Sequence, residues 1–225
     1  YDLMNDLMTR GMHRSWKRRT AVLAAKGLNG PALDVSTGTG DLALALERSV
    51  GVGRVVGIDL LPEMIGLARR RAASADLVLG DALALPFPDG AFAAATAGFS
   101  LRNMPDVEAA ISEMVRVLRP GGRLVLLELT PMIPGIRSFL FRPYFHWLVP
   151  LIGQMVAGDR TAYTYLPKSV DYFLSAERLA EMLAGLGLIR LGYCKLGSPM
   201  VGIPDETGCP GRWVWSILNA STECL

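Results

Sequence analysis

Residues 32–41 read ALDVSTGTGD, in which an apolar run gives way to a glycine-bearing loop and then to a helix-like stretch. This pattern predicts a buried strand, a tight loop and a helix, the unit from which α/β folds are built. Gly38 and Gly40 can adopt positive φ and carry no Cβ, so the loop backbone can approach a nucleotide-like ligand closely. Together with Ala43 they satisfy G-x-G-x-x-[GA], the spacing of dinucleotide-binding loops. The loop therefore predicts an adenosine cofactor without deciding which one.

Acidic residues around the loop favour one cofactor class. Asp34 precedes the glycines, and Asp41 follows them in the first turn of the expected helix, where NAD or FAD would place its pyrophosphate. A carboxylate about 4 Å from a phosphate costs about 4 kcal/mol at an effective dielectric near 20. S-adenosylmethionine (SAM) has no phosphate, and its sulfonium and ammonium groups are cationic. We therefore expect SAM, bound by Asp34, Gly38, Thr39 and Gly40; the alternative is that Asp41 only caps the helix.

Strands and helices alternate along the rest of the chain. The expected strands are 33–36, 55–59, 76–81, 91–100, 122–129 and 189–196. The expected helices are 41–50, 62–75, 106–118 and 175–187, the third of them ended by Pro120, Gly121 and Gly122. This alternation predicts a single α/β domain with a doubly wound, mostly parallel sheet, whose ligand loops lie at the carboxyl ends of the strands.

Further candidate cofactor residues follow the second, third and fourth strands. Asp59 ends the second strand and can accept hydrogen bonds from ribose hydroxyls, with Leu60 beside it. Asp81 and Ala82 follow the third strand, where the carboxylate can accept from an adenine amino group and the Ala82 N–H can donate to a ring nitrogen. Gly98 ends the fourth strand. The alternative for Asp81 is that it forms a turn.

The composition excludes several classes of protein. A chain of 225 residues with a formal net charge of +2 fits one compact domain and argues against a protein devoted to nucleic acid. The three cysteines lie far apart and there are only two histidines, so we expect neither a disulfide framework nor a metal site. No signal peptide is visible, and a cytoplasmic protein is expected.

The order of the motifs resembles the ubiquinone/menaquinone biosynthesis C-methyltransferases, the UbiE/MenG family. The stretches that carry the resemblance are YDLMNDLMTRGMHRSWKRRT (1–20), LDVSTGTGDLA (33–43), DALALPFPDGAF (81–92), FSLRNMPD (99–106), EMVRVLRPGGRLVLLEL (113–129) and, more loosely, 145–170. The resemblance implies a Rossmann-like class I methyltransferase fold with seven strands, and transfer of a methyl group from SAM to a ring carbon of a demethylated prenyl quinol. It also implies that residues 1–20 form a lid helix over the cofactor, with Tyr1 near the substrate. Three local departures are Gly98 where many relatives have Ser, the Ser36-Thr37 pair, and FSLRN in place of FGLRN.

Methylation of a quinol ring carbon requires a group that stabilises charge on the neighbouring oxygen. Arg102 and Asn103 follow the fourth strand at the ligand edge of the expected sheet. We expect Arg102 to stabilise the developing phenolate and Asn103 to orient the ring, with Phe99 as an apolar wall. The alternative is structural, with Arg102 binding carbonyls before a helix and Asn103 as its N-cap.

Residues 136–158 form the most apolar stretch of the chain. Its uncharged part, 143–158, is shorter than the roughly 20 residues that span a bilayer. We expect a lid insertion over 130–172, with Tyr144 and Trp147 lining a tunnel for the prenyl tail or facing a membrane; plain core packing is the alternative. A basic run in the first 20 residues either forms a solvated face or contacts anionic lipid: Arg10, Arg14, Lys17, Arg18 and Arg19.

Residues 197–225 depart from the ending usual in the family. The last strand is expected either at 200–203 or, after an excursion, at 212–218. This atypical tail keeps two alternatives open besides quinol methylation. One is a cofactor-binding protein without turnover, and the other is a methyltransferase of the same fold that acts on another lipid or small molecule.

Overall fold

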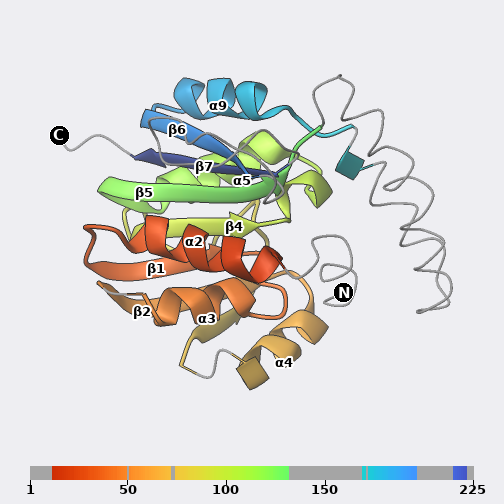
Figure 1. The fold of residues 1–225 in the computed structure, drawn as a ribbon. Helices are drawn as coiled ribbons and strands as arrows, with labels where there is room; N and C mark the ends of the chain where they lie inside the picture. The colour runs from red at the N-terminus through yellow and green to blue at the C-terminus, as the bar shows by residue number, and fades with distance from the viewer. Residues whose placement is uncertain are drawn as a thin grey trace, which may run out of the picture.

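The computed structural model describes residues 12–49, 51–71, 74–131, 169–170, 172–196 and 215–221. Its centre is a sheet with strand order β3-β2-β1-β4-β5-β7-β6 (Figure 1). The strands are β1 Gly30–Val35, β2 Val52–Asp59, β3 Asp76–Leu79, β4 Phe92–Gly98, β5 Leu118–Leu129, β6 Ile189–Leu196 and β7 Trp215–Ser221. β1 to β5 pair in parallel, and β7 lies antiparallel between β5 and β6. The expected doubly wound, mostly parallel α/β fold is confirmed.

Helices cover both faces of this sheet. They are α2 His13–Ala25, α3 Asp41–Glu47, α4 Pro62–Arg71, the short 3-10 helix η1 Leu101–Asn103, α5 Val107–Arg116 and α9 Ala176–Gly185. In Figure 1, α2 and α3 lie in front of the sheet and α5 behind it. The arrowheads of β4 and β5 point to the right of that view, so the ligand edge expected from the sequence is the right-hand edge.

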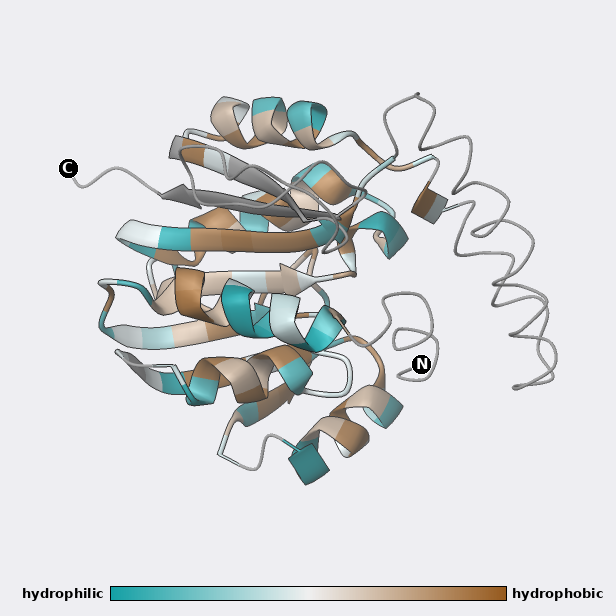
Figure 2. Cartoon of the chain, in the orientation of Figure 1, coloured by the Kyte–Doolittle hydropathy of each residue, from teal (hydrophilic) through white to brown (hydrophobic). Residues whose placement is uncertain are grey.

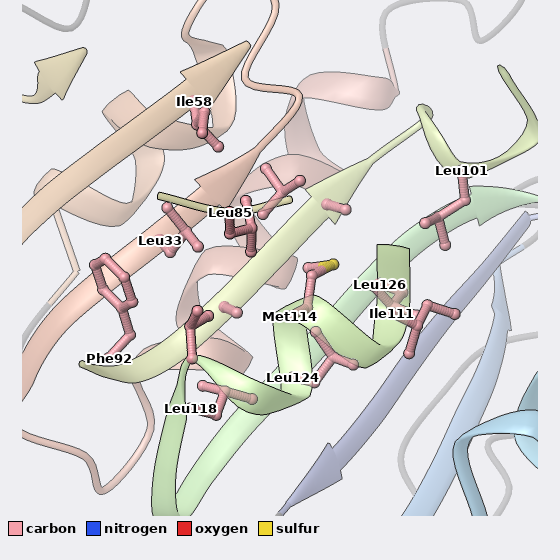
Figure 3. Close-up of a cluster of buried hydrophobic side chains, with 14 of the residues drawn as sticks. Leu33, Ile58, Leu85, Phe92, Leu101, Ile111, Met114, Leu118, Leu124 and Leu126 are labelled. Carbon is pink, nitrogen blue, oxygen red and sulfur yellow. The ribbon is translucent and has the colours of Figure 1, made fainter. Parts of the chain in front are cut away.

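Alternation along the strands builds two apolar layers, because successive strand residues point to opposite faces. Ala32 packs with Trp16 and Leu42 beneath α2 and α3, whereas the next residue, Leu33, packs with Met114 of α5 on the other face. Figure 3 shows this second layer, in which side chains from α5 lie against those from the strands. Consecutive buried strand residues thus supply both cores, which explains why the strands read as continuous apolar runs.

The element bounds differ from the expected ones mainly at helix ends. The helices expected at 41–50 and 62–75 end at Glu47 and Arg71. β5 begins at Leu118 rather than at 122, because Leu118 already pairs with Phe92 of β4. Pro120, Gly121 and Gly122 therefore lie inside the strand, where the β4–β5 register is irregular, a position at which proline is tolerated in a sheet.

The N-terminal segment contributes to the core. From His13 onward it forms α2, whose Trp16, Ala21 and Ala24 are buried against the sheet. Figure 2 shows a brown section and teal sections along this helix, in keeping with one buried and one solvated side. Residues 13–20 thus belong to a helix with one side packed on the sheet. Residues 1–11 of the expected lid lie outside the described residues.

Towards the C-terminus, β7 lies in the second of the two regions expected to carry the last strand, shifted to Trp215–Ser221. Residues 200–203 and most of the apolar insertion 130–172 lie outside the described residues. Within the described part, no helix is long and apolar enough to span a membrane. The same residues contain no cluster of side chains suited to hold a metal ion.

Candidate cofactor and active site

The topological switch point of the sheet lies between β1 and β4. After β1 the chain continues into α3 on one face of the sheet, and after β4 it continues into α5 on the other face. Two non-glycine residues with positive φ follow these two strands, Ser36 at 53° and Phe99 at 61°. Such conformations cost about 1–3 kcal/mol each and gather where a ligand site must be shaped. Both strained positions therefore point to the carboxyl ends of β1 and β4 as the site.

The glycine loop between β1 and α3 is held by backbone hydrogen bonds to β2 and within the loop itself. The Thr37 N–H donates to Ile58 O (2.9 Å) and the Gly40 N–H to Thr37 O (2.9 Å). Among the described residues, a Cβ on Gly38 would meet only Ser36 O, at 4.0 Å, so this side of the loop has room. A Cβ on Gly40 would lie 3.1 Å from Ala68 Cβ. Gly38 thus leaves space at the open side of the loop, whereas Gly40 lets α4 pack against it.

Asp34 lies beneath this loop. Its side chain is buried, and its carboxylate accepts hydrogen bonds from Thr37 Oγ1 (2.7 Å) and Thr96 Oγ1 (2.8 Å). Burial raises the pKa of Asp34 from its usual 3.8 to about 6, although these hydrogen bonds and the charge of Lys17 act in the opposite direction. Asp34 ties the loop to β4, and its expected contact with the cofactor stays a prediction.

The raised pKa of Asp34 gives a pH-dependent stability. Because the folded-state pKa of about 6 exceeds the usual 3.8, the native state binds the extra proton between these values. The contribution of Asp34 to the free energy of unfolding is therefore fully present below pH 3.8 and lost as the pH rises through 6. In Asp34→Asn this loss is absent, so the variant should gain stability relative to the parent between about pH 4 and 6 and keep a constant difference above about pH 7. Urea unfolding across this range measures the difference, and a difference that is flat from about pH 4 to 7 would contradict the assignment.

Asp59 ends β2 and faces the glycine loop. Its Oδ2 accepts the Gly38 N–H (2.8 Å) and its Oδ1 the Leu61 N–H (3.0 Å). Each carboxylate oxygen can accept a second hydrogen bond, as two ribose hydroxyls would require. The adjoining Leu60 is 61% exposed, an apolar surface beside a polar anchor. Asp59 thus lies at the carboxyl end of β2, and its expected contact with the ribose stays a prediction.

Asp81, Ala82 and Gly98 lie at the same edge. The Asp81 Oδ1 accepts the Leu83 N–H (2.9 Å), so this residue forms the turn considered as its alternative, while its remaining acceptor sites can still receive an adenine amino group. Gly98 is tightly packed, since a Cβ there would lie 3.2 Å from Leu42 Cδ2.

Asp41 is engaged in ion pairs. Its carboxylate binds Lys17 Nζ of α2 (2.9 Å) and Arg71 Nη1 of α4 (3.0 Å). Burial of Asp41 acts to raise its pKa, but the two neighbouring cations outweigh this effect and hold the pKa below its usual value. Arg71 Nη1 also donates to Thr39 Oγ1 (3.3 Å), so Thr39 is held from α4. The premise that Asp41 presents an unbalanced negative charge to a cofactor is therefore wrong.

Arg102 forms a buried ion pair that was not predicted from the sequence. It lies in η1 after β4, and its Nη1 donates to Oε1 of Glu128 near the end of β5. The side chains are only 5% and 0% exposed. Glu128 Oε1 also accepts the Leu129 N–H (2.8 Å), which fixes the carboxylate. The only hint in the sequence was an acidic residue inside the apolar run LVLLEL, because charged residues are almost never fully buried unless paired.

Two buried polar atoms beside this pair have no hydrogen-bond partner among the described residues. They are Arg102 Nε and Ser100 Oγ, both in the segment after β4. Leaving such an atom unsatisfied costs about 1–3 kcal/mol, so unpaired buried atoms call for an explanation such as a ligand.

Asn103 is exposed and lies in η1, and the N-cap of α5 is Asp106, which accepts the Ala109 N–H. Asn103 as the N-cap of the next helix is thus wrong.

The remaining expected substrate residues divide into two groups. Phe99 is only 3% exposed and packs with Trp16 and Leu42 in the layer under α2 and α3, so its side chain is directed into the core. Its expected role as a wall for the substrate stays a prediction that would have to act through the strained backbone at this position. Tyr1, Tyr144 and Trp147 lie outside the described residues.

The residues at this edge fit SAM. The open side of Gly38, the acceptor sites of Asp59 and the exposed Leu60 offer room, ribose acceptors and an apolar surface in one place. Asp59, Leu60, Asp81 and the glycine loop would hold it. None of these contacts requires a phosphate on the ligand.

Residues 1–205 match the model of the ubiE/COQ5 methyltransferase family. The demethylmenaquinone methyltransferase of Thermus thermophilus is 45% identical over 211 residues, which cover 92% of this chain and 96% of that protein. The ubiquinone/menaquinone biosynthesis C-methyltransferase UbiE of Desulfotalea psychrophila is 40% identical, with 90% of this chain and 83% of that protein covered. The structure of a SAM-dependent methyltransferase from Archaeoglobus fulgidus has a TM-score of 0.68 at 13% identity and covers 99% of this chain and 100% of that chain, which shows the shared fold.

The family match extends over both halves of the site, from the glycine loop to the Arg102 segment, and it agrees with the fold and with the residues at the switch point. The chain therefore belongs to the ubiE/COQ5 methyltransferase family and is a methyltransferase that uses SAM as its methyl donor.

Proposed function

We propose that this enzyme transfers the methyl group of SAM to a ring carbon of demethylmenaquinol or a related prenyl quinol. The observation that carries the proposal is the buried Arg102–Glu128 pair, which lies at the carboxyl end of β4, the strand next to the one that leads into the glycine loop. The names of the relatives from Thermus thermophilus and Desulfotalea psychrophila agree with a quinone substrate.

The chemistry asks two things of the protein. SAM supplies an electrophilic methyl group on a sulfonium, so the enzyme must hold a nucleophilic carbon in line with it; well-oriented reactants can gain about 7–11 kcal/mol in this way. The ring carbon becomes nucleophilic as the proton of the neighbouring hydroxyl is shared or lost. A hydrogen-bond donor aimed at that oxygen stabilises the charge that develops there.

Arg102 meets the second requirement. Glu128 holds one end of the guanidinium through Nη1, while Nε is buried and has no partner among the described residues. The hydroxyl oxygen of Ser100, two residues earlier, is also buried and also has no hydrogen-bond partner among the described residues. We assign Arg102 Nε and Ser100 Oγ as donors to the quinol oxygen, with Glu128 as the positioning residue and Asn103 at the exposed rim beside them.

Incubation of the protein with SAM and demethylmenaquinol, followed by mass spectrometry of the extracted quinols, tests this function. We expect a product heavier by one methylene unit, together with S-adenosylhomocysteine. SAM binding without any methylated product from a panel of quinols would favour the alternative of a cofactor-binding protein. Methylation of a different lipid or small molecule in preference to the quinols would favour the other alternative.

Asp59→Ala should weaken SAM binding by about 1–3 kcal/mol, because ribose hydroxyls would lose their acceptors. Isothermal titration calorimetry measures the change. The same carboxylate accepts the Gly38 N–H, so Asp59→Asn, which retains one acceptor oxygen, should show a smaller loss.

Asp89→Ala is the matched control for Asp59. Asp89 is an exposed acid that pairs with Arg116, and its removal changes the net charge equally. The SAM affinity of this control should equal that of the parent. Unchanged affinity in Asp59→Ala would remove Asp59 from the cofactor site.

A further inference from the structure

A groove of about 570 Å³ lies between α2 and α3, outside the site at the switch point. α2 contributes its solvated side, and the groove extends along α3 from Asp41 to the end of that helix. The residues that line it are His13, Arg14, Lys17, Arg18, Val22, Asp41, Leu44, Ala45, Arg48, Ser49 and Arg71. Five of these carry a positive charge and only Asp41 a negative one.

Within the described part of the chain, two of the positive charges of this basic groove, those of Arg18 and Arg48, have no acidic partner. Asp41 is already bound to both Lys17 and Arg71. Arg18 and Arg48 are exposed and form no ion pair with any described acid, and the Arg18 Nε donates only to a backbone oxygen, Arg14 O (3.4 Å). Like charges held together in a concave surface repel one another and attract an anion.

The end of the groove at Asp41 adjoins the cofactor loop. Lys17 and Arg71 line the groove and, through Asp41 and Thr39, hold the residues that follow Gly38. The last turn of α4 adds Arg69 and Arg70, which are exposed next to Arg71; this end of the helix is teal in Figure 2. The basic groove thus meets the cofactor loop at Asp41, the residue that follows Gly40.

We propose that this basic groove binds the phosphate-bearing headgroups of an anionic bilayer. Clusters of four to eight Lys and Arg on a helical surface are typical of anionic-lipid binding, and each cation near such a surface raises partitioning about fivefold. Val22, which is 59% exposed in the groove, adds an apolar contact beside the charges. A prenyl quinol partitions into the bilayer, so this docking surface places the ligand edge of the sheet beside its substrate; this last step rests on the proposed function.

The test compares binding of the full chain to vesicles of phosphatidylcholine alone and of phosphatidylcholine mixed with phosphatidylglycerol. Co-sedimentation should show at least about tenfold stronger binding to the mixed vesicles at low salt, lost at about 1 M salt, where the Debye length is about 3 Å. Arg18→Glu/Arg48→Glu should reduce that binding at least about tenfold, and Arg18→Gln/Arg48→Gln by less.

Arg54→Glu/Arg178→Glu is the matched control. It makes the same change in net charge at two exposed arginines on β2 and α9, outside the groove. It should bind the mixed vesicles like the parent. Equal loss in both double variants would overturn the groove as the docking surface, because net charge alone would then explain the binding.

Two further outcomes are informative. Equal binding of the parent to both kinds of vesicle would overturn the proposal. Competition by inorganic phosphate at submillimolar concentration would also overturn it, in favour of a site for a small free anion.

Methylation of a short-chain, water-soluble quinol should proceed at the same rate in Arg18→Glu/Arg48→Glu and in the parent. Absence of this activity from the parent itself would contradict the proposed function but would leave the vesicle-binding result unaffected.

Discussion

Replacing Arg102 with alanine is expected to lower the turnover number for quinol methylation by roughly 10²–10³, the range typical for removal of one electrostatic stabiliser. Arg102 would interact with an oxygen that becomes more negative during transfer, so its contribution is larger in the transition state than in the ground state. The affinity for SAM should change little, because the residues assigned to the cofactor, Asp59 and the glycine loop, are separate from the Arg102–Glu128 pair. Steady-state kinetics with varied quinol, together with calorimetry for SAM, separates the two effects.

Because its partner Glu128 is buried, Arg102→Ala should also lower the stability of the protein. It leaves Glu128 uncompensated in the core, and breaking such a pair from one side costs about 3–5 kcal/mol of stability. Arg102→Met/Glu128→Gln removes both charges together and should remain folded, yet show the same loss of turnover. Arg102→Lys should recover only part of the activity, because an ammonium lacks the guanidinium fork that can bind Glu128 and a second acceptor at once. Parental turnover in the folded double variant would make the pair structural.

Gly40→Ala is expected to destabilise the protein by about 2–5 kcal/mol, the sum of a backbone cost and a packing cost. Gly40 has a φ of 83°, where a Cβ costs about 1–2 kcal/mol. The added atom would also lie 3.1 Å from Ala68 Cβ and 3.2 Å from Ala68 Cα, so α4 would have to move, at a cost of about 1–3 kcal/mol. Thermal unfolding should show a melting temperature lower by roughly 4–20 °C. SAM affinity should fall as well, since α4 holds Thr39 and Asp41 through Arg71.

Gly66→Ala provides the comparison on the helix that packs against Gly40. Gly66 lies inside α4 and is exposed, and a Cβ added to it would meet no atom of the described residues within 4 Å. Alanine there should raise stability by about 0.5–1 kcal/mol, because glycine in a helix interior has excess conformational freedom in the unfolded chain. Equal melting temperatures for the two variants would show that Gly40 is not constrained by the approach of α4.

The order of strands, loops and helices was predictable because it depends on local periodicity. The strand expected at 189–196 has the bounds of β6, and the helices expected from 41 and 62 begin at Asp41 and Pro62. Asp59 was placed correctly at the ligand edge, since parallel strands bring their carboxyl ends to one side of a sheet. The true start of β5 was not predictable, because it depends on pairing of Leu118 with Phe92, a contact between distant parts of the chain.

By itself, the sequence determined the α/β architecture, the glycine loop and the family to which the protein belongs, because each is written in residues that are close together along the chain. The tertiary structure alone decided which charges are balanced. Lys17 and Arg71 reach Asp41 from 24 and 30 residues away, and Glu128 reaches Arg102 from 26 residues away. It also buried Asp34 and Phe99, two residues whose types suggest ligand contact. The physical reason is that the electrostatic state of a side chain depends on its partners and on its removal from water, and both are fixed only when the strands and helices pack.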